Sequence, residues 1–132
     1  MNKEFTNPDT LPPPRGYTHV VGARPGKIVF LSGQVALDAE GKVIGEGDLR
    51  AQTETTYSHV GAGLAAVGAS FGDLVKITTY VVDLTPDRRQ VIADVRSNYL
   101  PRQNPPASTM VGVSALAVPG LLIEVEVVAI LD

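Results

Sequence analysis

The spacing of apolar and polar residues divides the chain into segments with strand-like and helix-like patterns. β-Branched and aromatic residues that alternate with polar ones, or that form short unbroken runs, are typical of strands. Turn signals such as Pro119-Gly120 separate these runs. The pattern predicts strands at residues 18–21, 27–32, 42–44, 74–82, 108–113 and 121–131.

Two segments repeat apolar residues at intervals of three and four, which predicts amphipathic helices. The first covers residues 49–71, with Asp48 as its N-cap. The second begins at Thr85-Pro86-Asp87, which supplies a capping hydroxyl, a proline in the first turn and an acid near the positive end of the helix dipole. It extends to about Leu100, because the following Pro101 cannot continue a helix.

The order of these elements predicts a single α+β domain over residues 16–132, preceded by a loose, proline-rich segment at residues 1–15. Two helices can cover only one face of the expected sheet. The strands at 74–82 and 121–131 are nevertheless apolar on both faces over much of their length, so the second face needs a cover. We therefore expect a homo-oligomer with this open face at the subunit contacts, where ligand clefts are common.

Two carboxylates interrupt the apolar strand at residues 121–131. Because side chains alternate along a strand, Glu124 and Glu126 should point to the same face, roughly 6.6 Å apart along the chain. A buried carboxylate without a partner is costly, so both must face water, a cleft or a hydrogen-bond donor. This face is the predicted functional surface. A glycosidase-like carboxylate pair fits the spacing alone, with no other support in the sequence.

Composition narrows the classes of function. The 132 residues include 11 basic and 14 acidic side chains, for a net charge of −3, so we expect no nucleic-acid partner. The absence of cysteine excludes disulfides, thiolate nucleophiles and thiolate metal ligands. His19 and His59 are the only histidines and make a poor metal site, so we expect no metal and no cofactor. A Ser-His-Asp triad assembled in space stays open, although no Gly-x-Ser-x-Gly elbow is present.

Targeting signals are also missing from the sequence. No stretch approaches the roughly 18 apolar residues of a membrane span, and residues 1–14 contain no apolar signal-peptide core. We therefore expect a cytoplasmic protein with no membrane partner.

Four local motifs follow one another along nearly the whole chain: Gly16-Tyr17, Phe30-Leu31-Ser32-Gly33-Gln34, Gly72-Asp73-Leu74-Val75-Lys76 and Ile123-Glu124-Val125-Glu126. A proline-rich loop precedes Ser108. In these motifs and in its layout, the chain resembles the Rid family (reactive intermediate deaminases, also called YjgF). The resemblance implies a chorismate-mutase-like α+β subunit with a six-stranded mixed sheet and two helices on one face. It also implies a homotrimer with three clefts at the subunit interfaces, where deaminating members hydrolyse imines or enamines to a 2-oxo acid and ammonia.

The resemblance also implies a set of site residues. Glu124 would position or activate a water for attack on a C=N or C=O carbon, and Tyr17 would contact the ligand. Ser32 and Gly33 end a strand, where a backbone N–H could hold an oxyanion. Each residue has a structural alternative: a carboxylate tied to a donor at the subunit contact, an interface tyrosine, or an ordinary strand end. Glu126 is expected in a structural ion pair.

The chain departs from the family pattern at three positions. The arginine that grips the substrate carboxylate falls at Ser108, a cysteine becomes Met110, and an asparagine becomes Ile92. Ser108 and Thr109 would hydrogen-bond a neutral ligand, or only the neighbouring backbone. Loss of the arginine would cost a 2-imino acid about 2–5 kcal/mol, which argues against that substrate class. Arg102, six residues upstream of Ser108, could reach into the cleft from its rim, although nothing in the spacing requires it.

Three functions follow from the resemblance and its departures. The first is a trimer that acts on a small metabolite in its interface clefts, by hydrolysis of an imine, an enamine or a related carbonyl compound. The second is a non-catalytic ligand-binding or chaperone-like trimer, because the arginine is lost. The third is a ribonuclease or translation inhibitor, a label that some family members carry and that the acidic composition disfavours.

Overall fold

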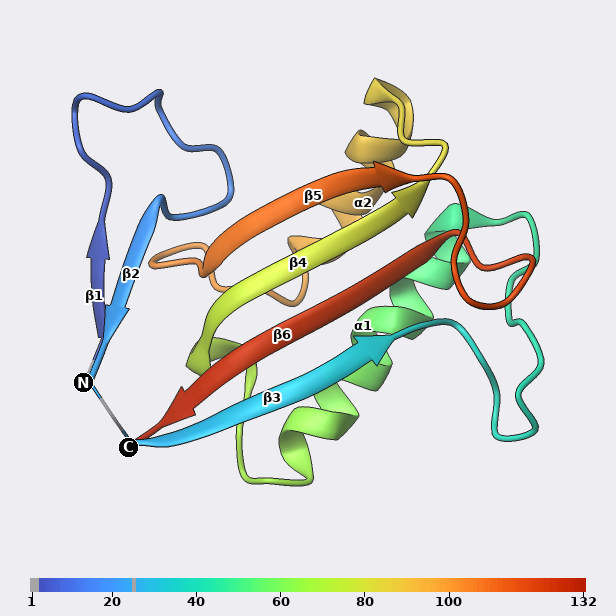
Figure 1. Ribbon diagram of the computed structural model, residues 1–132, viewed down its shortest axis with the longest axis horizontal. Helices are drawn as coiled ribbons and strands as arrows, with labels where there is room; N and C mark the ends of the chain where they lie inside the picture. The colour runs from blue at the N-terminus through green and yellow to red at the C-terminus, as the bar shows by residue number, and fades with distance from the viewer. Residues whose placement is uncertain (1–2, 25) are drawn as a thin grey trace.

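Six strands and two α-helices follow one another in the computed structural model, which describes residues 3–24 and 26–132 (Figure 1). One long loop joins the first strand to the second, and another joins the third strand to the first helix. A short 3₁₀ helix, η1, precedes the fourth strand. The elements are β1 (Lys3–Thr6), β2 (Val20–Ala23), β3 (Lys27–Gln34), α1 (Leu49–Ala65), η1 (Phe71–Asp73), β4 (Leu74–Val82), α2 (Pro86–Arg96), β5 (Ala107–Val113) and β6 (Ile123–Leu131).

The main sheet has the strand order β3-β6-β4-β5 (Figure 1). β6 pairs antiparallel with both β3 and β4, whereas β4 and β5 are parallel, so the sheet is mixed. A parallel pair needs a long crossover, and α2 supplies it between β4 and β5. β1 and β2 pair with each other in a separate two-stranded ribbon.

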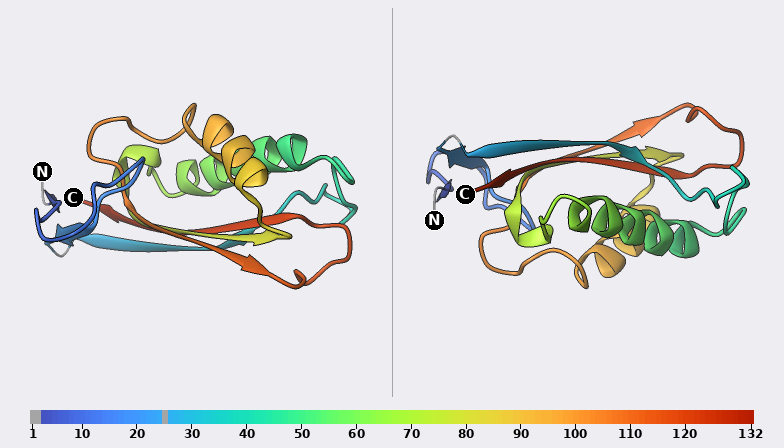
Figure 2. Two further views of the ribbon diagram at one scale, coloured as in Figure 1. Left: turned by 90° about the horizontal axis from the view of Figure 1, so that it is seen from above. Right: turned by 90° about the horizontal axis from the view of Figure 1, so that it is seen from below.

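Both helices pack on one face of the main sheet, and the opposite face carries no helix (Figure 2). The core lies between the helices and the sheet and includes Tyr57, Val60 and Leu64 of α1, Ile92 of α2 and Ile77 of β4. The predicted α+β class, with six strands in a mixed arrangement and two helices on one face, is confirmed. Among the described residues the six strands divide into the four-stranded sheet and the two-stranded ribbon.

The predicted helix starts are confirmed. The Asp48 carboxylate accepts a hydrogen bond from the Ala51 backbone N–H at 3.0 Å, and Thr85 Oγ1 accepts one from the Arg88 N–H at 3.2 Å. The predicted end of the first helix at residue 71 is wrong, because α1 ends at Ala65. Gly68 adopts a φ of +78°, a left-handed conformation that no helix can contain and that glycine reaches without strain.

The other boundaries differ modestly from expectation. α2 ends at Arg96, and turns fill the chain between it and Pro101. The short strand expected at residues 42–44 is an isolated bridge between Leu37 and Val43. Within the segment expected to be loose, residues 3–6 form β1 instead, which pairs antiparallel with β2. The polar sequence Lys-Glu-Phe-Thr gives little strand signal by itself, and pairing with β2 decides its structure.

A buried glutamine fixes the loops around β6 to the first helix. The Gln52 side chain is fully buried, and its Nε2 donates to the carbonyl oxygens of Gly120 at 2.9 Å and Gly45 at 3.2 Å. Its Oε1 accepts from the Leu122 backbone N–H at 2.8 Å. All polar groups of this amide are therefore used to place α1 against the start of β6.

Candidate functional site

Glu124 and Glu126 lie on the open face of the sheet, as the alternation predicts. Their neighbours Ile123, Val125 and Val127 are buried in the core on the helix side. Glu124 is paired in register with Tyr80 of β4, and Glu126 with Thr78. The two carboxylates therefore occupy the face that no helix covers.

Glu126 has a hydrogen-bond partner on the neighbouring strand. Tyr80 Oη donates to its Oε1 at 2.6 Å, so the partner is a phenol and not the cation of the expected ion pair. This hydrogen bond, with burial and the two nearby carboxylates, raises the pKa of Tyr80. On the same face Lys76 Nζ donates to Thr109 Oγ1 at 2.6 Å. Thr109 is thus held by a lysine on the sheet surface.

Glu124 lies against the backbone of Gly33. The register of β3 and β6 shifts between Leu31 and Gln34, so one extra residue of β3 is accommodated there as a β-bulge. A Cβ added to Gly33 would overlap Oε2 of Glu124, which only glycine permits. Among the described residues, no hydrogen-bond donor is found for the Glu124 carboxylate, which leaves it available to a ligand or a water.

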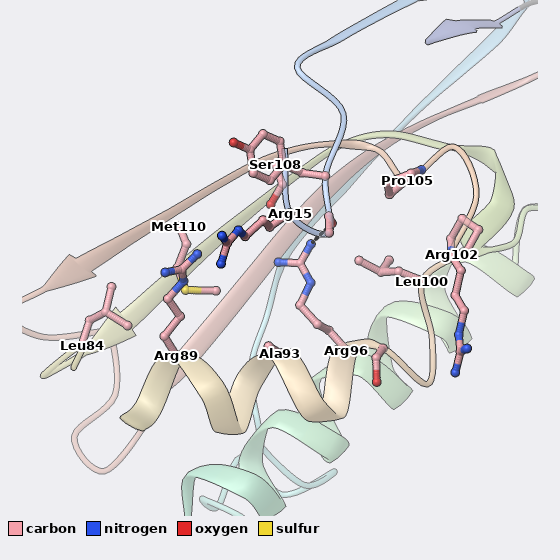
Figure 3. Close-up of a pocket in the computed structure, with 14 residues that line it drawn as sticks. Arg15, Leu84, Arg89, Ala93, Arg96, Leu100, Arg102, Pro105, Ser108 and Met110 are labelled. Atoms are coloured by element: carbon pink, nitrogen blue, oxygen red, sulfur yellow. Dashed lines mark hydrogen bonds between the residues drawn. The ribbon is translucent and has the colours of Figure 1, made fainter. Parts of the chain in front are cut away.

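Tyr17 and Ser108 line a cavity on the helix side of the sheet, between α2 and β5 (Figure 3). Its volume is about 620 Å³, within the range of small-molecule sites. Met110 and Leu100 contribute apolar surface, and Thr18, next to Tyr17, donates from Oγ1 to the Pro105 carbonyl at 2.6 Å. That bond fixes the loop after Pro14 to the loop before β5 and so shapes one wall of the cavity.

Four arginines line the same cavity, and its lining includes no aspartate or glutamate. The guanidinium groups of Arg15, Arg89 and Arg96 project into the space between α2 and β5, whereas that of Arg102 points away at the rim (Figure 3). Arg96 Nη2 donates to the Gly16 carbonyl at 3.3 Å. Although Ser108 stands where the resemblance implies the arginine, the fold surrounds this position with other guanidinium groups.

Sequence reasoning missed these arginines because they come from separate segments. Arg15 belongs to the segment before β2, and Arg89 and Arg96 belong to α2. One signal was available: Arg89 and Arg96 are seven residues apart, which places them on one face of a helix with Ala93 between them. Only the packing of α2 beside β5 reveals that this face meets Arg15.

The predicted site residues therefore form two groups within one chain. Tyr17 and Ser108 line the cavity beside α2. Ser32, Gly33 and Glu124 lie on β3 and β6, which are separated from β5 by β4. The cavity beside α2 is lined by no carboxylate. Ser32 lines a second, smaller hollow on the open face with Lys76 and Glu126, and Glu124 does not line either of the two.

The two histidines hydrogen-bond backbone carbonyls. His19 Nε2 lies 2.7 Å from the Pro12 carbonyl oxygen, and His59 Nδ1 lies 3.0 Å from that of Val35. In residues 3–24 and 26–132, no group of three or more histidine, cysteine, aspartate or glutamate side chains has a geometry suited to a metal ion. Over the same residues, no helix is long and apolar enough to cross a membrane.

Comparisons with known proteins place these features in a family. Residues 8–131 match the family described as Endoribonuclease L-PSP. A RutC family protein of Pyrococcus abyssi is 34% identical over 130 residues, which is 98% of each chain. The chloroplastic Reactive Intermediate Deaminase A of Arabidopsis thaliana is 32% identical over 133 residues, covering 99% of this chain and 67% of that protein.

The same family appears among solved structures. A protein of unknown function from Yersinia pestis, described as a member of the conserved Rid family, superposes with a TM-score of 0.84 and is 36% identical. The alignment covers 99% of this chain and 100% of that one. The chorismate-mutase-like fold class and the family predicted from the four sequence motifs are both confirmed. The chain belongs to the Rid (YjgF, L-PSP) family.

Proposed function

We propose that the chain forms a homotrimer that hydrolyses an imine or enamine of a small metabolite in clefts between its subunits. The observation that carries this proposal is the Glu124 carboxylate, which faces away from the helices against Gly33 without a hydrogen-bond donor among the described residues. A carboxylate in this state is suited to accept a proton from water.

The open face of the sheet supports self-association. Phe30 is 76% exposed on β3, and Ile28 is 52% exposed on the same strand. Val111 adds further exposed apolar surface on β5. A soluble chain gains free energy by covering such a face, and a second copy of itself is the simplest cover.

The division of the site residues supports a shared cleft. One subunit offers the cavity lined by Tyr17 and Ser108, and the next offers Ser32, Gly33 and Glu124 on its open face. Brought together, the two groups would combine a ligand cavity with a general base. This arrangement also gives a role to both groups of site residues that were predicted from the sequence.

The proposed reaction needs one water and one base. Glu124 accepts a proton from water while the water oxygen attacks the C=N carbon, and the nitrogen takes up a proton to give a carbinolamine. The C–N bond then breaks and ammonia leaves, so that one imine and one water yield one carbonyl compound and one ammonia. Two relatives carry names of this kind, the Arabidopsis protein and a 2-iminobutanoate/2-iminopropanoate deaminase of Salmonella typhimurium, which is 36% identical over 66 residues.

A non-catalytic ligand-binding trimer is the second candidate. What favours it is the uncharged Ser108, which lines the cavity and stands where the resemblance implies the family's carboxylate-binding arginine. Both candidate functions place a ligand in the same cavity, but only the first includes its hydrolysis.

The test follows ammonia release from imines generated in situ by an amino acid oxidase. We expect the wild-type chain to exceed the blank, and Glu124→Gln to lose about 100-fold or more of that rate. Glu126→Gln is the matched control, because it removes the same charge from the same face two residues away and should retain most of the activity. Equal rates for wild type and Glu124→Gln would refute a base at this position. Binding without turnover, unchanged in Ser108→Arg, would favour the second candidate.

A further inference from the structure

The cavity beside Ser108 concentrates positive charge in an acidic chain. The net charge of the chain is −3, yet four arginines and no carboxylate line this cavity. Three of the guanidinium groups project into the same space (Figure 3). Like charges gathered in a concave surface raise the local potential and attract anions.

The cavity arginines are not neutralised within the described part of the chain. The one ion pair found there joins Arg50 to Asp94 at 3.6 Å, on the exposed surface of the two helices. Arg96 donates only to a neutral carbonyl, that of Gly16. Arg88, which is adjacent to Arg89, donates to the Val82 carbonyl and does not line the cavity. Of these two adjacent arginines of α2, only Arg89 lines the cavity.

The rest of the lining limits the kind of anion. Leu84, Ala93 and Met110 give the cavity an apolar part, which suits a short carbon chain and not a bare inorganic ion. The Tyr17 and Ser108 side chains add hydroxyl groups that can donate to a carboxylate or carbonyl oxygen. One guanidinium group can bind two oxygens of a carboxylate or a phosphate at once. Three guanidinium groups are therefore more than a single carboxylate requires.

We infer that this cavity binds small organic acids that carry two negative groups, either two carboxylates or a carboxylate and a phosphate. Arg89 and Arg15 would hold one group and Arg96 the other, over the apolar part of the cavity. As a statement about the substrate, the inference rests on the proposed function and specifies an imine derived from an acidic amino acid. As a statement about binding, it stands independently of turnover.

Calorimetry with matched ligands tests the binding. Succinate and butyrate have the same four carbons and differ in one carboxylate, and 2-phosphoglycolate replaces one carboxylate by a phosphate. We expect succinate or 2-phosphoglycolate to bind at least 10-fold more tightly than butyrate. The tighter of the two identifies the second acidic group. Arg89→Gln should weaken that ligand at least 10-fold, whereas Arg88→Gln removes the same charge one residue away and should change it less than 3-fold.

Deaminase assays separate this inference from the proposed function. Imines are generated from aspartate and from alanine by the corresponding oxidases, and ammonia release is compared. Faster hydrolysis of the aspartate-derived imine, with the preference lost in Arg89→Gln, supports both. Equal hydrolysis of the two imines, with equal affinities for succinate and butyrate, keeps the proposed function and overturns the inference. Arg89-dependent binding of a dianion without any turnover keeps the inference and overturns the proposed function.

Discussion

The carboxylate of Glu124 covers the Cα of Gly33, and the β-bulge in β3 is what brings the two residues together. Side chains on regular neighbouring strands stand beside one another, and here the missing side chain of glycine lets the glutamate lie across the partner strand. The carboxylate is thereby held on the open face, against the backbone of Gly33.

A methyl group at residue 33 should displace this carboxylate. In Gly33→Ala the added Cβ overlaps Oε2, Cδ and Cγ of Glu124, so the whole side chain must move. We expect imine hydrolysis to fall at least 10-fold in the ammonia-release assay, because small misplacements of a catalytic group are costly. Gly22→Ala is the control, since a Cβ there lies at an ordinary 3.8 Å from Glu4. Full activity in Gly33→Ala would show that the contact between Glu124 and Gly33 is not needed for catalysis.

The exposed phenylalanine of β3 should control assembly. Phe30 is 76% exposed on the open face, and Phe30→Asp would place an unpaired charge in the proposed subunit contact. We expect light scattering to report a trimer for the wild-type chain and a shift of at least 100-fold in its dissociation constant for the variant. Val67→Asp, which alters an apolar residue 38% exposed in the turn after α1, should leave the mass unchanged. A wild-type mass of one chain would remove the trimer from the proposal.

The buried amide of Gln52 should contribute strongly to stability. Gln52→Leu keeps a similar volume but leaves the Gly120 carbonyl and the Leu122 N–H without their partner. Unpaired buried backbone groups cost about 1–3 kcal/mol each, so we expect the free energy of unfolding to fall by about 3 kcal/mol or more in urea titrations. Gln90→Leu, which removes an exposed side-chain hydrogen bond to Asp94, should change it by less than about 0.5 kcal/mol.

Tyr57 should make the chain sensitive to alkaline pH. Burial raises the pKa of its phenol from 10.0 to about 12, although the charge of Arg96 opposes this shift. Because the native state holds the proton more tightly than the unfolded chain, the stability from this group is complete below pH 10 and is lost as the pH rises towards 12. The loss is limited to about 2–3 kcal/mol by the size of the shift.

Tyr57→Phe tests this dependence. Among the described residues, the buried Tyr57 hydroxyl has no hydrogen-bond partner, so its removal should leave the stability at pH 8 equal or higher. Between pH 10 and 12, the variant should lose less free energy of unfolding than the wild type in denaturant titrations. Parallel losses in the two proteins would show that another group controls the alkaline transition.

The sequence predicted most of the fold because its local signals agree with the tertiary structure. Thr85 and Asp48 cap the helices that follow them, and the strand around Glu124 has the predicted alternation. The end of α1 was misplaced because Val67 and Phe71 continue the apolar period, and the left-handed Gly68 overrides it. β1 was missed because its structure depends on its partner β2 and not on its own residues.

The candidate site was only half accessible to sequence reasoning. Glu124, Gly33 and Ser32 lie in motifs, so local sequence was sufficient to select them. The charge of the cavity depends on Arg15, Arg89 and Arg96, which meet only when α2 packs beside β5 (Figure 3). Ser108 was predicted at this site from the sequence, but an uncharged serine gives no indication of the guanidinium groups that line the same cavity.

The central position of β6 has a consequence for biosynthesis. β6 follows every other described element in the chain and yet lies between β3 and β4. Until residues 123–131 have emerged from the ribosome, β3 therefore lacks its sheet partner and β4 is paired only with β5. Until then the nascent chain exposes two unpaired strand edges, which are sites for aggregation. Chaperone demand should therefore be greatest before residues 123–131 emerge, and truncation within β6 should separate β3 from the β4-β5 pair instead of shortening the sheet at one edge.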